Sequence, residues 1–190
     1  AHGAVRMMLP MVSTIDEVRL GREIVITIQD GFKRKGISFD PTMPMGAMIE
    51  VPAAAICADL FANELDFLAI GSNDLTQYTV AVDRDSDMVA YLQDPLQPAI
   101  LRLIESTIVA ATNNNIRVSL CGELAGNTKY TKDLLGLGLT EFSVCPSALL
   151  ETKEIINRSS VEKLRPYSNA LLYAGHMEER DRLLTELESA

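Results

Sequence analysis

The fold class is decided by residues 66–78, which read DFLAIGSNDLTQY. The apolar run from Phe67 to Ile70 is typical of a buried strand, and an amide and a carboxylate, Asn73 and Asp74, follow shortly after it. In α/β proteins the carboxyl edge of a parallel sheet holds ligands and metals, whereas the opposite edge mostly serves stability. The stretch therefore predicts a strand that presents functional side chains at its carboxyl end.

Two further segments have the same layout. Residues 45–50, MGAMIE, end in Glu50, and residues 117–121, RVSLC, end in Cys121. Each is followed by a proline or glycine within two residues, which is typical of a strand that gives way to a helix. Three strand ends thus offer a carboxylate, an amide with a carboxylate, and a thiol.

Strands and helices alternate along the rest of the chain. Residues 5–12 form a continuous apolar run that predicts a buried parallel strand, and residues 141–145 predict a fifth strand. Four helical regions are expected: one from the capping box Thr14 and Glu17, with Ile15, Val18, Val25 and Ile28 as its buried face before Gly31; one from Pro52; one from Pro98 to about Asn113; and one after Pro146 that runs to the end.

Regular strand and helix alternation predicts one parallel-sheet domain, either doubly wound or a barrel. Polar groups at the same end of consecutive strands favour a (β/α)8 TIM-type barrel, because a doubly wound sheet gathers its active residues at one switch point. A complete barrel needs eight strands and ~250 residues. We therefore expect residues 1–190 to be a partial barrel domain that holds about five later strands.

Composition narrows the class of partner. The net charge of −9 argues against a nucleic-acid surface, since phosphate backbones are bound through clustered Lys and Arg. The 3 cysteines are odd in number and lack metal-type spacing, which predicts reduced thiols in a cytoplasmic protein. No apolar run approaches the ~20 residues of a membrane span, so no membrane insertion is expected.

Four segments together carry a resemblance to a known family: residues 46–54 (GAMIEVPAA), 71–78 (GSNDLTQY), 79–84 (TVAVDR) and 121–126 (CGELAG). In this order they resemble the carboxy-terminal phosphoenolpyruvate-binding domain of the enzyme I family, the phosphoenolpyruvate-protein phosphotransferases of the bacterial sugar phosphotransferase system. The chain is similar, more loosely, to pyruvate phosphate dikinase and phosphoenolpyruvate synthase. The resemblance implies that phosphoenolpyruvate gives its phosphoryl group to a histidine and leaves as pyruvate, with Mg²⁺ bound.

The resemblance also implies roles for individual residues. Glu50 and Asp74 would hold the metal, which agrees with the one or two carboxylates that Mg²⁺ usually takes from a protein. Asn73, Asp74 and Arg84 would bind the substrate, and a guanidinium grips phosphate oxygens in a bidentate fork. Cys121 would be the general acid that protonates the enolate of pyruvate, since a thiol with a pKa near ~8.5 keeps its proton at neutral pH.

Each of these residues also has a plainer interpretation. Glu50 and Asp74 are equally suited to stabilise helix N-termini, the first by its charge and the second as a cap. Arg84, between two aspartates, is suited to a surface ion pair. Cys121, taken alone, is suited to a small core position, and Cys57 and Cys145 are expected to be packing residues.

The partners follow from what the chain lacks. Its 2 histidines, His2 and His176, lie outside the Thr-Ser-His context of the family's phosphorylated histidine, so the acceptor is expected on a separate histidine-bearing phosphocarrier domain and protein. The isolated chain is not expected to catalyse the reaction.

Alternative functions are a non-catalytic dimerisation or phosphoenolpyruvate-sensing module, or a dikinase- or synthase-type enzyme that uses ATP. We expect a homodimer, because the family dimerises through this domain and open sheet edges favour association.

Overall fold

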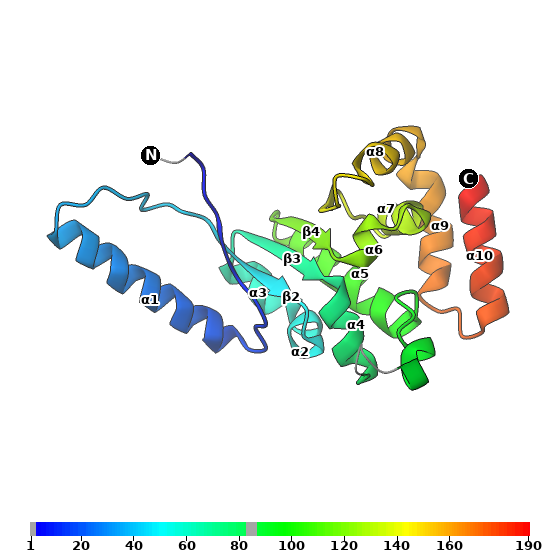
Figure 1. Cartoon of the computed structure of the whole chain (residues 1–190), viewed down its shortest axis with the longest axis horizontal. Coiled ribbons are helices and arrows are strands. Elements are labelled where there is room, and N and C mark those ends of the chain that lie inside the picture. The colour runs from blue at the N-terminus through cyan, green and yellow to red at the C-terminus, as the bar shows by residue number, and fades with distance from the viewer. Residues whose placement is uncertain (1–2, 83–86) are drawn as a thin grey trace.

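Five parallel strands form a single sheet in the order of the sequence (Figure 1). The structure, a computed structural model, describes residues 3–82 and 87–190. The strands are β1 (Met7–Leu9), β2 (Met45–Ile49), β3 (Phe67–Gly71), β4 (Arg117–Cys121) and β5 (Glu141–Phe142). Sequential neighbours without a switch point are the arrangement of consecutive barrel strands. The expected α/β class, with five parallel strands of a barrel, is confirmed.

Helices connect the strands and extend beyond the last of them. They are α1 (Ile15–Arg34), α2 (Pro52–Ile56), α3 (Ala58–Glu64), α4 (Ser72–Val80), the 3-10 turn η1 (Asp87–Leu92), α5 (Pro98–Asn113), α6 (Glu123–Gly126), the 3-10 turn η2 (Thr128–Tyr130), α7 (Thr131–Gly136), α8 (Leu149–Arg158), α9 (Val161–Leu171) and α10 (Met177–Ser189). Figure 1 shows α1 at one end of the molecule and α9 and α10 at the other, with the sheet between them. None of the helices in the described ranges combines the length and the apolar character that crossing a membrane requires.

The two faces of the sheet differ because side chains alternate along each strand. One face is buried with the helices in the main core, which includes Ile49, Leu68, Ile70 and Leu120 from the strands and Ile100, Leu101 and Ile104 from α5. The other face lines a concave hollow of about 290 Å³, to which β4 contributes Arg117, Ser119 and Cys121. Arg117 pairs there with Glu141 of β5 at 3.2 Å. The buried face fixes the sheet, and the concave face is left to carry polar groups.

The first helix begins as predicted but packs less than predicted. The Glu17 carboxylate accepts hydrogen bonds from the backbone N–H groups of Ser13 and Thr14 at 2.7 and 2.9 Å, which completes the capping box and lowers the pKa of Glu17. The helix continues through Gly31 to Arg34, so the expected end before Gly31 is wrong. Of its expected buried face only Val18 is fully buried, and Ile28 is 49% exposed, because Val25 and Ile28 line an open hollow between α1 and the segments on either side of it.

Two edge strands and two cysteines also depart from expectation. The strand predicted over residues 5–12 is only three residues long and half exposed, because the chain leaves the sheet at Pro10 and Met11 adopts a left-handed φ of 55°. The strand predicted over residues 141–145 ends at Phe142.

Cys57 and Cys145 are both exposed, so their prediction as packing residues is wrong. The Cys145 thiol lies 3.1 Å from the Ser147 hydroxyl in the turn before α8.

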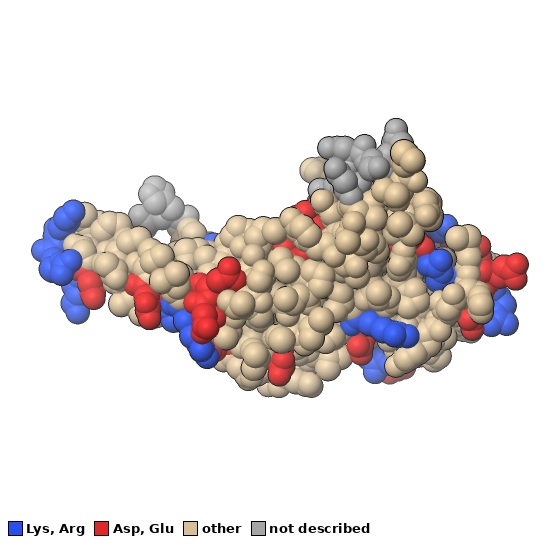
Figure 2. Space-filling view, turned by 90° about the horizontal axis from the view of Figure 1, so that it is seen from below, with Lys and Arg blue, Asp and Glu red and all other residues tan. Residues whose placement is uncertain are grey.

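Charged side chains are spread over the surface without a continuous basic region on the face seen in Figure 2. Basic side chains gather at the end of α1, where Lys33 and Arg34 occupy the last turn. Acidic side chains are interspersed with the basic ones along the same face. This distribution agrees with the low pI of 4.7 and gives no support to a phosphate-backbone surface.

A buried carboxyl group lies in the helical layer at the carboxy-terminal end. Asp133 on α7 is 0% exposed, and burial raises its pKa to about 7. The Ser168 hydroxyl on α9 partly offsets this rise, although neither carboxylate oxygen has a well-formed hydrogen bond within the described residues. Asp133 is therefore held as a neutral acid at slightly acidic pH.

The raised pKa of Asp133 predicts a pH-dependent stability. Between pH ~4 and ~7 the folded chain keeps a proton that the unfolded chain has lost, so the free energy of unfolding falls as pH rises through this window and levels off above it. Asp133→Asn removes this dependence and is expected to stabilise the chain at pH 8 by up to roughly 4 kcal/mol, with little gain at pH 4. Urea unfolding at both pH values measures the difference.

The exposed Asp59 on α3 provides the control. Asp59→Asn should leave the pH profile of unfolding as it is in the parent chain, because the Asp59 side chain is exposed to solvent. Parallel profiles for Asp133→Asn and the parent chain would contradict the assignment.

Candidate functional site

Glu50 lies across the carboxyl ends of three strands. It follows the last residue of β2 and is 3% exposed. Its Oε1 accepts a hydrogen bond of 2.8 Å from the backbone N–H of Met11, just beyond β1. Its Oε2 lies over Gly71 at the end of β3, where a Cβ would collide with the carboxylate. The glycine thus leaves the space that the carboxylate occupies.

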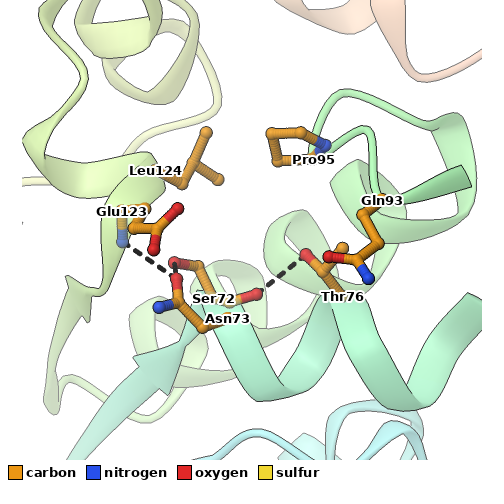
Figure 3. Close-up of a pocket in the computed structure, with 7 residues that line it drawn as sticks. All are labelled: Ser72, Asn73, Thr76, Gln93, Pro95, Glu123 and Leu124. Carbon is orange, nitrogen blue, oxygen red and sulfur yellow. Dashed lines mark hydrogen bonds between the residues drawn. The ribbon is translucent and has the colours of Figure 1, made fainter. Parts of the chain in front are cut away.

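Asn73 and Asp74 lie in the first turn of α4, directly after β3. The Asn73 Oδ1 accepts a hydrogen bond of 2.9 Å from the backbone N–H of Glu123, the first residue of α6. Figure 3 shows this bond across the end of β4. The helix start after β3 and the helix start after β4 are therefore tied together by one amide side chain.

Cys121 is the last residue of β4 and lies opposite Gly71 in the ladder. Its half-buried thiol donates a weak hydrogen bond of 3.5 Å to the carbonyl oxygen of Ile70. Burial raises the pKa of the Cys121 thiol, and the negative charges of Glu50 and Asp74 raise it further. The thiol consequently keeps its proton at neutral pH.

One cavity opens at this edge of the sheet, and a second lies along its concave face. A pocket of about 410 Å³ is lined by Ser72, Asn73, Thr76, Gln93, Pro95, Glu123 and Leu124 (Figure 3). Cys121 instead lines the concave hollow, where barrel strands present their side chains. Asn73 and Cys121 therefore line different cavities.

The structure brings together most of the residues that the sequence singled out. Glu50, Asn73, Asp74 and Cys121 gather at one edge, and their roles stay predictions. Arg84 lies outside the described residues.

The donor set at this edge fits Mg²⁺ in kind. Within residues 3–82 and 87–190, no cluster of three or more His, Cys, Asp or Glu side chains forms a metal cage. Two carboxylates supply hard oxygen ligands, and Mg²⁺ completes its shell with water and substrate oxygens. A fully protein-bound metal such as structural zinc would need four ligands. Glu50 and Asp74 are thus suited to a metal that is held jointly with a substrate.

Three residues at this edge had no predicted role. Ser72 and Gly122 make the contacts around Asn73, and Met11 supplies the N–H that holds Glu50. A small hydroxyl residue at the start of a helix and a glycine after a strand are signals that sequence reasoning can use. Met11 gave no such signal, because a methionine at a left-handed φ of 55° is unusual.

Fold and site together define a class: a segment of a parallel (β/α) barrel whose carboxyl edge carries two carboxylates, an amide and a protonated thiol. The chain belongs to the family described as PEP-utilising enzyme, PEP-binding domain, whose sequence pattern matches residues 1–161. This membership confirms the family resemblance of the sequence motifs.

Relatives with curated names point the same way. The chain is 41% identical over 187 residues to the phosphoenolpyruvate-protein phosphotransferase of Cupriavidus necator. The aligned region covers 98% of the chain and 32% of that protein. It is 41% identical over 179 residues to the protein of that name from Streptococcus equinus and 39% identical over 178 residues to the one from Priestia megaterium, in each case over 94% of the chain and 31% of the relative. The chain spans about a third of the length of these relatives.

The close approach of Glu50 to Gly71 predicts the effect of one methyl group. Gly71→Ala would place a Cβ against the Glu50 carboxylate, 2.8 Å from the Glu50 Cβ and 3.0 Å from the Met48 sulfur. We expect this overpacking to lower the free energy of unfolding by about 1–3 kcal/mol. Urea unfolding of the chain measures the loss.

A second glycine serves as the matched control. Gly31 lies inside α1, and a Cβ added there would meet no neighbouring atom within 4 Å, so Gly31→Ala should stabilise the helix by about 0.5–1 kcal/mol. An equal response of both glycines would mean that Glu50 does not occupy the space over Gly71.

Proposed function

We propose that this chain is the later part of the phosphoenolpyruvate-binding barrel of a phosphoenolpyruvate-protein phosphotransferase. It would bind Mg²⁺ and phosphoenolpyruvate for transfer of the phosphoryl group to a histidine on a separate domain, and release pyruvate. The observation that carries the proposal is the protonated Cys121 thiol beside Glu50 and Asp74, in a chain of the PEP-binding family. The greater length of the relatives leaves room for the other barrel strands and the histidine domain outside these 190 residues.

The substrate would be held mainly by charge and hydrogen bonds. Glu50 and Asp74 would bind Mg²⁺, which supplies neutralisation of the phosphoryl oxygens when bound. The Asn73 Oδ1 is occupied by Glu123 N–H, so its NH₂ group is the part that would donate to a substrate oxygen. Arg84 would add a bidentate grip on the phosphate.

Cys121 would act after the phosphoryl group leaves. The bond between phosphorus and the enol oxygen breaks, the phosphoryl group passes to a histidine nitrogen, and the enolate of pyruvate remains. Cys121 would then give its proton to the terminal carbon of the enolate, and the thiolate would regain a proton from water. The raised pKa of the thiol supports this role, because an acid must keep its proton until the enolate forms.

The shared name of the three relatives favours a protein phosphotransferase over a dikinase or synthase that uses ATP. We also propose that this chain belongs to the sugar phosphotransferase system, with a phosphocarrier protein as the downstream partner. Three cysteines without a disulfide agree with a cytoplasmic location.

We also propose a homodimer. A sedimentation experiment that shows only monomer at high concentration would exclude it.

Substitution of a carboxylate tests the metal assignment in the full-length protein. Glu50→Gln keeps the side-chain shape but removes a charged ligand, so Mg²⁺-dependent binding of phosphoenolpyruvate should weaken about 10- to 100-fold. Titration calorimetry with and without Mg²⁺ measures the change, and Asp74→Asn should behave alike. The exposed Glu23→Gln on α1 is the control, and equal affinities in all three variants would exclude the assignment.

Substitution of Cys121 tests its proposed role as general acid. Cys121→Ala in the full-length protein should slow pyruvate formation about 10²- to 10⁴-fold, because the enolate loses its positioned proton donor. Phosphorylation of the histidine should persist, since that step does not use the thiol. Cys145→Ala, which removes an exposed thiol, should leave both steps unchanged. Undiminished pyruvate formation by Cys121→Ala would rule out the acid role.

A further inference from the structure

Ser72 connects the two strand ends that carry the thiol and the amide. It is the first residue of α4 and is 1% exposed. Its hydroxyl donates a hydrogen bond of 2.7 Å to the carbonyl oxygen of Cys121. Because Gly71 lies opposite Cys121 in the ladder, this bond continues the pairing of β3 and β4 one step beyond its last backbone pair. The carbonyl of the thiol-bearing residue is therefore held from the neighbouring strand.

A hydrogen bond from Glu123 determines how the neighbouring Asn73 amide is oriented. The backbone N–H of Glu123 can only donate, so the Asn73 atom 2.9 Å from it must be the carbonyl oxygen. The Ser72 oxygen is 3.4 Å from the same Oδ1, and its single proton goes to the closer Cys121 carbonyl. Within the described part of the chain the NH₂ group of Asn73 has no hydrogen-bond partner, which leaves it available to a ligand.

Gly122 allows these two bonds to form side by side. Its φ of 95° is left-handed, and a Cβ at this position would collide with the Ser72 hydroxyl and lie 2.7 Å from the Asn73 Oδ1. The exit of β4 is therefore pressed directly onto Ser72 and Asn73. One hydrogen bond holds the carbonyl before the glycine, and the other holds the N–H after it.

We propose that Ser72 is a positioning residue, which fixes the Cys121 thiol for proton donation. This proposal rests on the function proposed above. Ser72 does not itself reach the reacting atoms. Its hydroxyl holds the Cys121 backbone, and the backbone sets where the thiol lies relative to Ile70, Glu50 and Asp74.

Three substitutions in the full-length protein separate the hydroxyl from the shape of the side chain. Ser72→Ala removes the hydroxyl, whereas Ser72→Thr keeps it and Ser72→Val has the shape of threonine without it. Loss of one buried neutral hydrogen bond predicts a kcat for pyruvate formation about 2- to 10-fold lower in the alanine and valine variants. KM for phosphoenolpyruvate should change by less than about 2-fold, and the threonine variant should keep a kcat near the parent value.

A second readout follows the thiol without any turnover. The rate of Cys121 alkylation by iodoacetamide, resolved by mass spectrometry of the peptides, gives the apparent pKa of the thiol. In the alanine and valine variants a looser strand end admits water, so this pKa should move down towards that of an ordinary thiol. The threonine variant should keep the parent profile. A merely structural role would lower the unfolding midpoint without this shift.

The outcomes distinguish the two proposals. Parent-like kcat and a parent-like alkylation profile in both the alanine and valine variants overturn the role of Ser72, as does a lower unfolding midpoint alone. If the parent protein forms no pyruvate from phosphoenolpyruvate, or Cys121→Ala forms it undiminished, the proposed function fails instead. The alkylation profile still decides in that case whether Ser72 holds the thiol.

Discussion

The parallel register of β2, β3 and β4 is the constraint on which the site depends. Ile49 lies opposite Ile70, and Gly71 lies opposite Cys121, so the three strands finish at one level. The residues that come next are consequently neighbours in space although they are more than 20 positions apart in sequence. A shift of one strand by a single residue would turn its side chains to the other face of the sheet. The buried aliphatic residues of the opposite face hold the register against such a shift.

The charge balance at this edge favours a protonated cysteine over a nucleophilic thiolate. Reactive thiolates arise beside cations or helix N-termini, which lower the pKa of the thiol. Cys121 has two carboxylates for neighbours and is half buried, and both conditions favour the protonated form. A bound divalent cation would change this balance, because it would offset the charge of the carboxylates. Release of the thiol proton is thereby linked to what occupies the carboxylate edge.

The central elements could be predicted from the sequence, and the peripheral ones could not. The strand at 117–121 and the helix from Pro98 have the bounds expected of them, because each combines a strong apolar pattern with a clear stop signal. β1 and β5 are shorter than predicted because edge strands pair on one side only, and α1 is more exposed because its expected buried face lines an open hollow. Asp133 gave no signal as a buried acid, since Lys132 precedes it and the segment reads as a solvated helix start.

Some of the site residues could likewise be predicted from the sequence, and others could not. Glu50, Asn73, Asp74 and Cys121 were identified because each follows a recognisable strand, whereas Ser72 escaped notice although it stands in the same motif. Its importance comes from a contact across 49 residues, which no local pattern encodes. The predictions that Cys57 and Cys145 are packing residues were wrong, because the general preference of cysteine for the interior does not apply to a helix junction or a turn.

The pair of Arg117 and Glu141 on the concave face constrains any segment that packs against it. Their side chains are 66% and 36% exposed, so water still solvates both charges. Any polypeptide that closes over this hollow would remove that solvation, and an ion pair enclosed without further hydrogen bonds is costly. A segment that closed over the hollow would therefore have to bring donors and acceptors to this pair or enclose water beside it, whereas the interiors of complete barrels are filled mostly with branched aliphatic side chains.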